Sequence, residues 1–312
     1  SDGFDLLLDD KDDLIDPPRK GAKIKIWMGY RSLGPHLGAA GLSYLGEFVV
    51  DEIEVTIGPR RLRITGKGAD MREKLKSPKT KGWGEGNDDL TLQKVMGKIA
   101  SDHKLDLKIA GDIGSKNVPD FIQSEESDLH LASRLAEKVG AIVKYADGKM
   151  IVAKRGSGEA TSGKAMPTIV LTLPDLIAGR GKLKDRERYG AAKATWHDQA
   201  KARRVSVTEK QGEGPDYELR QTYQSEAEAR DACKAKLADL QRRSADVSLT
   251  IPGDPTVCAE AKLLLVGVSR KLDGEWIVEQ ARHVMSGSGS GFQTQIEAKT
   301  PGQRDDKGGK SK

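Results

Sequence analysis

Hydrophobic and polar residues alternate along much of the first seventy residues. In "DEIEVTI", Ile53, Val55 and Ile57 fall on one face of an extended chain, and acidic or hydroxyl side chains fall on the other. The runs "FDLLL", "KIKIWMGY" and "RLRITG" repeat this spacing, with Gly58-Pro59 as a turn before the last of them. Period-two runs separated by Gly and Pro predict the strands of an antiparallel barrel or sandwich.

The hydrophobic period changes after residue 90. The segment "LTLQKVMGKIASDHKL" spaces its apolar residues for a helix, with one face formed by Leu92, Val95, Met96, Ile99 and Ala100. A short strand, "LDLKIA", follows it. Further on, "AIVKY" and "KMIVAKR" flank Asp147-Gly148, the turn signal of a β-hairpin. The stretch from Leu90 to Arg155 therefore predicts a small α+β domain.

Within this stretch, "SEESDLHLASRLAEKVG" concentrates groups that acid–base catalysis and metal sites use: Glu125, Glu126, Asp128 and His130. A metal site on one helical face needs ligands at positions i and i+4. Ala132 stands four residues after Asp128 and cannot bind a metal, and His130 lies on a neighbouring face. The segment is therefore interpreted as the start of a helix.

In this interpretation Ser124 is the N-cap, Glu125 and Glu126 lie in the first turn, and Ser127 and Asp128 are alternative caps. Carboxylates at this position accept hydrogen bonds from free backbone N–H groups and meet the positive end of the helix dipole. The predicted apolar stripe, ended by a left-handed Gly140, consists of Leu129, Ala132, Leu135, Ala136 and Val139.

The strand pattern returns after "GSGEATSGK", residues 156–164, which has the composition of a linker. The predicted strands here are "TIVLTL", "YGAAKATWHD", "RRVSVTEK", "DVSLTI", "KLLLVGV", "EWIVEQARHVM" and "FQTQIEAK". One helix interrupts them, because Ser225 and Glu228 form a capping box before an Ala- and Leu-rich run that reaches Arg243.

The composition narrows the class of protein. Hydrophobic residues make up 37% of the 312 residues and aromatic residues only 4%, so the cores must be aliphatic. The net charge of +5 is spread along the chain and forms no basic stripe of the kind that nucleic-acid binding requires. No apolar run approaches the ~20 residues of a membrane helix, and no secretory signal is visible. Cys233 and Cys258 lack the spacing of a zinc site, and the sequence leaves open whether they pair.

No candidate motif supports catalysis or cofactor binding. The five histidines are scattered, and the Gly-rich stretches "GPHLGAAG" and "GRGKLK" lack the spacing of a phosphate loop, so both are predicted to be surface turns. His197 and Asp198 are neighbours on a predicted strand and point to opposite faces. We therefore expect no catalytic, cofactor-binding or metal-binding residues and no cofactor.

The order of four segments is more specific than any single residue. These are "GEFVVDEIEVTIGPRRLRITGKGAD", "LTLQKVMGKIASDHKL", "QSEESDLHLASRLAEKVGAIVKYADGKMIV" and "LDGEWIVEQARHV". In this order the chain resembles the late control D family, the baseplate hub proteins of contractile phage tails, which are related to the N-terminal part of VgrG. The resemblance extends from Asp2 to about Thr300.

The resemblance implies two similar antiparallel β-barrels per subunit, which form a pseudo-sixfold ring in a homotrimer. It divides the chain into a first β-barrel at residues 1–72, an α+β insert at 73–155, a second β-barrel region at 156–300 with one helix at about 225–243, and a flexible tail at 301–312. Because relatives usually have a further strand before "SDGFDLLLDD", either the first barrel is incomplete or the chain is trimmed.

The resemblance also implies a role and partners. Such a ring adapts the sixfold tail tube, or a tube initiator, to a threefold spike that is a separate protein here. It surrounds a channel for the tape-measure protein and later for passing DNA, contacts baseplate wedge proteins, and inserts into no membrane. The expected location is the virion tail baseplate, after assembly in the bacterial cytoplasm.

Three other functions stay open at this stage. A contractile bacteriocin or other injection particle would use the same part. A tail-associated cell-wall hydrolase would need a carboxylate pair or a Cys/His set in a cleft, which the sequence does not display. A DNA-binding regulator would need a clustered basic face, but acidic residues accompany the lysines of the first predicted helix.

One possible contact with other proteins is the polar segment "KSPKTKGWGEGNDD", predicted to be a loop. Lys79 and Lys81 precede Trp83 in it, and an exposed Trp between charged residues suits an interface. The alternative is that Trp83 covers the core of its own domain.

Overall fold

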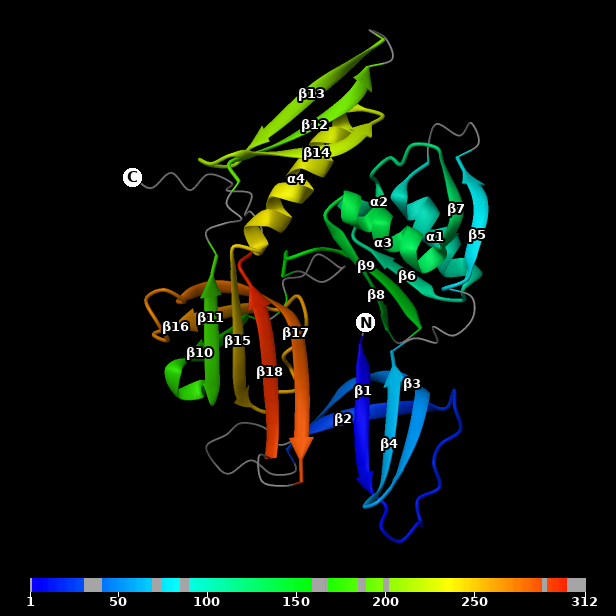
Figure 1. Cartoon of the computed structure of the whole chain (residues 1–312), viewed down its shortest axis with the longest axis vertical. Helices are drawn as coiled ribbons and strands as arrows, with labels where there is room; N and C mark the ends of the chain where they lie inside the picture. The colour runs from blue at the N-terminus through cyan, green and yellow to red at the C-terminus, as the bar shows by residue number, and fades with distance from the viewer. Residues whose placement is uncertain are drawn as a thin grey trace. The chain divides into compact units, whose positions relative to one another are not determined.

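The computed structural model describes residues 2–30, 41–68, 75–84, 90–146, 148–158, 166, 168–184, 189–198, 202–287 and 291–301. The chain folds as two compact units (Figure 1). The first consists of Ser1–Leu135 and Val143–Val152, and the second of Ala136–Ile142 and Ala153–Lys312. No helix of the described ranges is both long and apolar enough to cross a membrane.

The first unit begins with a four-stranded antiparallel sheet in the order β1-β4-β3-β2. Its strands are β1 (Gly3–Asp9), β2 (Lys23–Tyr30), β3 (Gly41–Ile57) and β4 (Arg60–Lys67). The predicted alternation is confirmed, because Val50, Leu62 and Ile64 are buried on one face and Phe4 and Leu8 pack against them. The Gly-rich stretch "GPHLGAAG" lies almost wholly outside the described residues.

The α+β part of the first unit follows this sheet. Its elements are β5 (Pro78–Trp83), α1 (Leu92–Asp102), β6 (Asp106–Ile109), α2 (Gly111–Gly114), β7 (Phe121–Ser127), α3 (Asp128–Lys138), β8 (Ala141–Ala146) and β9 (Lys149–Lys154). Strands β8 and β9 are neighbours in a sheet of order β6-β9-β8, as the predicted hairpin requires. The five residues buried on α1 are the five that periodicity predicted. The end of α3 and the start of β8 (Ala136–Ile142) belong to the second unit, as does the chain from Ala153 onward.

Two local predictions in this part are wrong. Pro78–Trp83 is a strand paired with β7, although the polar segment around it was predicted to be a loop. Helix α3 begins at Asp128, so Glu125 and Glu126 lie on β7 and not in a first helical turn. Both errors have one cause, because β5 and β7 stabilise each other across about forty residues of sequence that a local pattern does not connect.

The buried face of α3 is shifted accordingly. Its members recur at the spacing of a helical stripe that starts at the first residue of the helix, namely Asp128, Leu131, Ala132, Leu135 and Ala136. Leu129 and Val139, which were predicted to belong to it, are only half-buried. Gly140 ends the helix with a φ of +71°, as predicted for a left-handed C-cap.

The second unit contains two further sheets. Their strands are β10 (Thr168–Thr172), β11 (Ala178–Leu183), β12 (Ala191–Asp198), β13 (Arg203–Lys210), β14 (Asp216–Tyr223), β15 (Ala245–Pro252), β16 (Lys262–Val266), β17 (Gly274–Ser286) and β18 (Gly291–Lys299). The six-stranded sheet has the order β10-β16-β17-β18-β15-β11, with β10 parallel to β16 and the other pairs antiparallel. Its buried face is aliphatic apart from Trp276, as the composition suggested.

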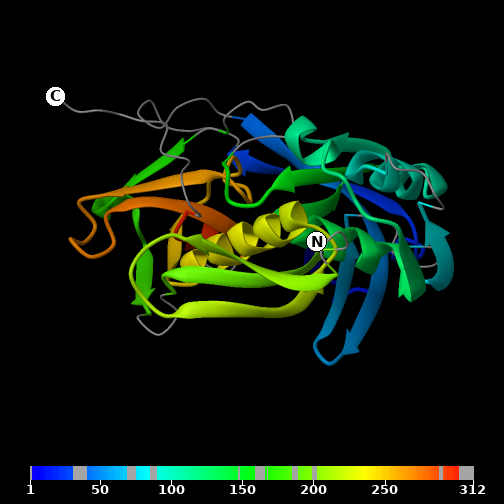
Figure 2. The same cartoon turned by 90° about the horizontal axis from the view of Figure 1, so that it is seen from above.

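The smaller sheet, of order β13-β12-β14, packs against α4 (Glu226–Arg242) through alanines, Cys233 and Leu237 (Figure 2). Strands β11 and β14 were not predicted, and "GRGKLK" is part of β11 and not a surface turn. Cys233 is buried and Cys258 is exposed, and no disulfide joins them.

The predicted mainly β fold with an α+β insert is confirmed by this architecture. The residue bounds proposed for the barrels and the insert stay a prediction. Most of the linker and residues 302–312 of the tail lie outside the described residues.

The predicted start of α4 is confirmed. The Ser225 hydroxyl accepts a hydrogen bond from the backbone N–H of Glu228 at 3.2 Å, and the Glu228 carboxylate accepts one from the backbone N–H of Gln224 at 3.1 Å. We expect Ser225→Ala to destabilise α4 by about 1 kcal/mol, because a free N–H loses its acceptor. Hydrogen exchange of the first turn of α4 measures this loss. Ser225→Gly is the control, with a cost of only a few tenths of a kcal/mol, and equal exchange in Ser225→Ala and the unmodified chain would contradict the capping role.

Candidate protein interface

The three residues predicted as an interface lie on β5. Period-two spacing places Lys79, Lys81 and Trp83 on the same face of the strand, and all three are at least half-buried. Their cross-strand neighbours belong to β7: Lys79 lies opposite Glu126, Lys81 opposite Gln123 and Trp83 opposite Phe121. The structure therefore brings the three together on the side of the strand that faces the unit's own interior.

Trp83 belongs to the core of the first unit. Only 7% of its surface is exposed, and its ring stacks on Phe121 with the centroids 6.0 Å apart. The Lys81 ammonium lies 4.0 Å from the centroid of the indole ring. The premise of an exposed Trp is wrong, and the alternative, in which Trp83 covers its own core, is what the structure shows. A contact of Lys79 or Lys81 with another protein stays a prediction.

A fully buried glutamine links Trp83 to the start of α3. The Gln123 side-chain oxygen accepts a hydrogen bond from the Trp83 indole N–H at 3.0 Å. Its amide nitrogen donates to the backbone oxygen of Glu126 at 2.8 Å and to the Asp128 carboxylate at 3.1 Å. Both donor hydrogens and the acceptor of the amide are thereby used, which makes burial of this polar side chain tolerable.

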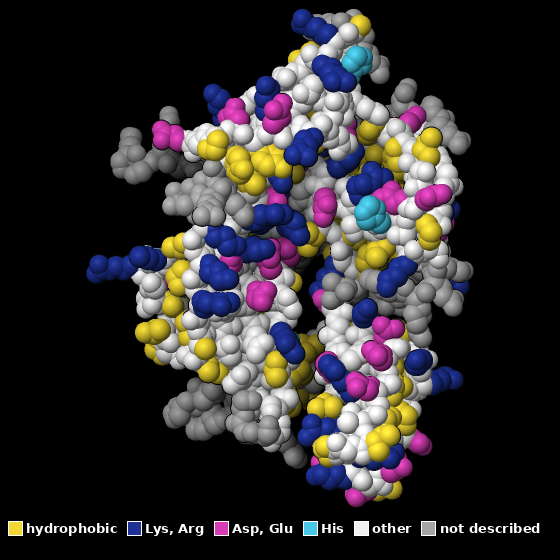
Figure 3. Space-filling view, in the orientation of Figure 1, with side chains coloured by type: hydrophobic (Ala, Val, Ile, Leu, Met, Phe, Trp, Pro, Cys, Tyr) yellow, Lys and Arg dark blue, Asp and Glu magenta, His cyan; other side chains and the backbone are white. Residues whose placement is uncertain are grey.

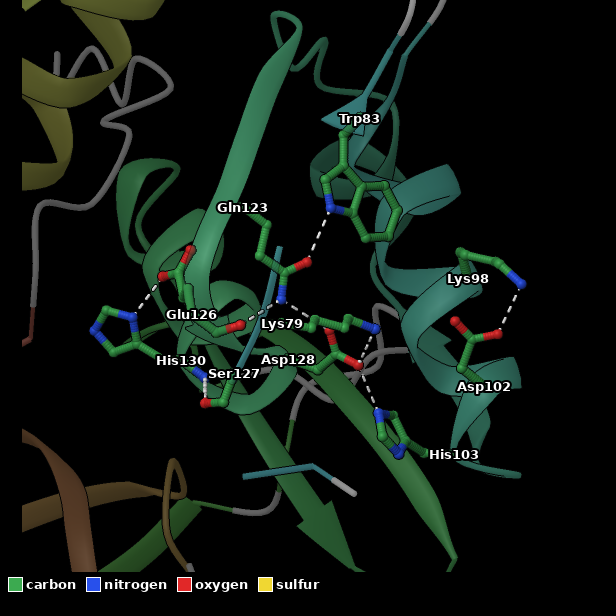
Figure 4. A network of polar contacts seen from close by, with 10 residues as sticks. All are labelled: Lys79, Trp83, Lys98, Asp102, His103, Gln123, Glu126, Ser127, Asp128 and His130. Carbon is green, nitrogen blue, oxygen red and sulfur yellow. Dashed lines mark hydrogen bonds and ion pairs between the residues drawn. The ribbon is translucent and has the colours of Figure 1, made fainter. Parts of the chain in front are cut away.

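Asp128 is the centre of this network (Figure 4). It is almost completely buried, and its Oδ2 lies 2.7 Å from both Lys79 Nζ and His103 Nε2. Burial raises the pKa of Asp128, but the hydrogen bonds from Lys79, His103 and Gln123 together lower it further than burial raises it. The carboxylate therefore stays ionised and ties β5, the end of α1 and the start of α3 together.

Glu126 has a similar but more exposed arrangement. The Arg134 guanidinium donates two hydrogen bonds to the Glu126 carboxylate, at 2.9 and 2.7 Å, and His130 Nδ1 lies beside the same carboxylate. Arg134 is the main cause that lowers the pKa of Glu126, although burial opposes it. The Ser127 hydroxyl accepts from the backbone N–H of His130 at 3.3 Å, so Ser127 acts as the cap of α3 that was proposed as an alternative to Ser124.

Two carboxylates of this segment, Glu126 and Asp128, therefore hold the fold together, because each is bound to cations of its own unit. Among the described residues no group of three or more His, Cys, Asp or Glu side chains is suited to hold a metal ion. Glu125 has a φ of +48° beside a register shift between β5 and β7. Sequence reasoning missed His103 and Gln123, because nothing in the local pattern marks a polar residue that will be buried against a distant strand.

We expect the first unit to lose stability in acid because of these carboxylates. A group whose pKa is lowered by folding contributes stability above its ordinary pKa and loses that contribution as the pH falls through the folded value. The ordinary values are 4.5 for Glu126 and 3.8 for Asp128, so the loss should occur below them. Urea unfolding at pH 6 and pH 3 measures the difference. The drop should be smaller in Glu126→Gln, and an identical drop would contradict the assignment.

Comparison with known proteins decides the family. A model of the phage tail baseplate hub (GPD) family matches residues 88–289, which is more than half of the chain. The chain belongs to the phage tail baseplate hub family. The match includes α1, β7, α3 and most of the second unit, so Asp128, His103 and Gln123 lie in the part of the chain that carries this relationship, whereas Lys79 and Trp83 precede it.

Similar proteins extend the relationship to nearly the whole hub chain. The probable baseplate hub protein of Escherichia phage 186 is 29% identical over 96% of this chain and 85% of its own length. That of Escherichia phage P2 is 28% identical over 95% of this chain and 84% of its own length. A 43 kDa tail protein of prophage MuSo2 from Shewanella oneidensis has the same fold, with a TM-score of 0.67, 15% identity, and 96% of this chain and 89% of that chain covered.

Family membership confirms the resemblance found in the sequence. This protein is a structural baseplate hub protein, and its place is the tail baseplate of the phage particle.

Proposed function

We propose that this hub protein forms a homotrimeric ring that joins the sixfold tail tube to the threefold spike and surrounds the central channel. The observation that carries the proposal is the family match over residues 88–289. The two β regions support it, because three copies of a chain with two β walls provide six walls, the number needed beneath a sixfold tube. The two relatives are phage proteins, so the proposal is made for a phage tail.

The proposed partners follow from this position. A separate spike protein binds below the ring, the tail tube or its initiator binds above, and wedge proteins of the baseplate bind outside. The tape-measure protein occupies the channel, and the DNA later passes through it transiently. The α+β insert lies on the outside of the ring, because a separately cored segment can pack there without interrupting the β walls.

The mass of the purified protein tests the ring. Light scattering should give about three times the 33.8 kDa of the chain, alone or with its spike protein. A monomer under both conditions would contradict the proposal. A map of the assembled tail tip should place three copies around the tail axis, and a single copy on the axis or a place in the outer sheath would contradict it as well.

We also propose that the chain has no enzymatic activity. The carboxylate-rich start of α3 supports this, because Asp128 and Glu126 are held by cations of their own unit. Zymography on bacterial cell walls tests it, and a zone of clearing that depends on either carboxylate would show a hydrolase instead.

A further inference from the structure

One end of the first sheet carries the two most exposed large hydrophobic residues described in the chain. This is the end where β1 leads into β2 and β3 turns into β4 (Figure 1). Ile57 is 86% exposed and Leu14 is 83% exposed, and Val55 on the same strand as Ile57 is 48% exposed. We call these three residues the apolar tip.

Cross-strand pairing and ion pairs bring the members of the tip to the same end of the sheet. Ile57 pairs with Arg60 across the β3–β4 turn. The Arg60 guanidinium forms an ion pair with Asp13, the residue before Leu14, and its Nε lies 3.6 Å from the Asp10 carboxylate. The loop between β1 and β2 is thereby attached to the start of β4, and Leu14 is held at the same end of the sheet as Ile57.

The loop is built to present Leu14 outward. Asp10 is buried, and its Oδ1 accepts hydrogen bonds from the backbone N–H groups of Leu14 and Ile15, each at 3.1 Å. Ile15 packs against the buried face of the sheet. Leu14 is therefore fixed between two anchored neighbours while its own side chain faces solvent.

Val55 and Ile57 lie on the face of the sheet that is buried further along the strand, but they stand beyond the loop that covers this face. Alternation places Val55 and Ile57 on the face of β3 that bears Ile53, and Val55 lies opposite the buried Leu62. Single exposed hydrophobic residues are common on proteins, but a group of them on an anchored framework marks a binding surface.

The surroundings of the tip are acidic. Residues 9–16 contain five aspartates and one lysine, a formal charge of −4, which Arg60 and Arg61 opposite Ile57 and Thr56 reduce to −2, in a chain whose net charge is +5. Figure 3 shows hydrophobic side chains among acidic and basic ones at this end of the sheet, at the lower right of the view. An acidic rim repels the phosphates of DNA and anionic membranes and favours a surface of opposite charge.

We infer that the apolar tip docks into another protein of the same tail, one that offers an apolar pocket edged by Lys and Arg. Leu14 and Ile57 would fill the pocket, and Asp12 and Asp16 would face its basic rim. The inference rests on the proposed function in one respect, namely that the partner is sought among the proteins of the tail. The apolar tip itself is defined by the contacts of the first unit.

A photo-crosslinking residue at position 14 identifies the partner. The full chain, with p-benzoylphenylalanine in place of Leu14, is assembled into tails and irradiated, and cross-linked peptides are sequenced by mass spectrometry. We expect a peptide of a different tail protein that contains Lys or Arg. The control places the same probe at Ile122, which is 71% exposed on β7 of the same unit and should not reach that peptide. Cross-links only to this chain or to DNA, or none in assembled tails, would overturn the inference.

Binding of the purified cross-linked protein then tests the chemistry. Leu14→Ser with Ile57→Ser should weaken binding about tenfold or more, and Ile122→Ser should leave it unchanged. Asp12→Asn with Asp16→Asn should weaken binding and make it less sensitive to salt. Binding that is indifferent to both pairs would overturn the inference. Light scattering on each variant distinguishes a failure of this inference from a failure of the proposed function. A variant that still has the mass of a trimer has kept the ring, whatever its binding to the partner.

Discussion

Asp128→Ala is expected to destabilise the first unit by about 3 kcal/mol. The substitution leaves Gln123 and His103 buried without their acceptor and removes the charge that compensates Lys79. Breaking a buried charge pair by removing one partner typically costs about 3–5 kcal/mol. We expect the lower end of this range, because the Lys79 side chain is 35% exposed and can turn towards water. Hydrogen exchange of the β7 and α3 peptides measures the loss.

Asp102→Ala provides the matched control. Asp102 forms an exposed i,i+4 pair with Lys98 at 2.7 Å, drawn beside the Asp128 network in Figure 4. Exposed helical pairs of this kind contribute about 0.3–0.5 kcal/mol. A similar small loss in both variants would show that Asp128 is no more important than a surface carboxylate, and the account of a fold-defining network would be wrong.

Leu131→Ala is expected to cost about 2–5 kcal/mol. The side chain is completely buried on α3, four residues before Leu135 on the same face. Truncation loses the transfer free energy of the removed carbons and leaves a cavity that the surrounding residues fill only in part. Urea unfolding followed by the exchange of α1 and α3 amides should show the loss in the first unit.

Leu129→Ala tests whether the buried face of α3 is assigned correctly. Leu129 is half-buried and two residues away, so its truncation should cost clearly less than that of Leu131. The sequence pattern by itself predicted the opposite order, because it placed Leu129 on the apolar stripe and omitted Leu131. A larger loss of stability for Leu129→Ala than for Leu131→Ala would show that the buried face of α3 is the one predicted from the sequence.

Local amphipathic patterns were sufficient for several elements. The buried face of α1 follows from the spacing of five apolar residues, and the start of α4 follows from Ser225 and Glu228. In both cases the determining interactions lie within one or two helical turns of each other, so one segment of sequence contains all the information. The order of such segments along the chain was enough to indicate the family.

Elements that depend on distant partners could not be predicted in this way. The six residues of β5 include three polar ones, a proline and a glycine, and they form a strand because β7 lies beside them and because Trp83 and Lys79 find partners in Gln123 and Asp128. The parallel pairing of β10 with β16 joins segments about ninety residues apart. A period-two pattern predicts that a strand forms but not which strand it pairs with.

The candidate site shows the same division. The sequence by itself determined that a helix starts near Asp128, because capping and the helix dipole act locally, but it placed Glu125 and Glu126 in the first turn, whereas both lie on β7. Only the tertiary structure decided that Asp128 is buried and that Trp83 faces inward, because both depend on Gln123, His103 and Lys79 meeting from separate elements. Burying a charge is favourable only once its partners are in place, and that condition is a property of the folded chain.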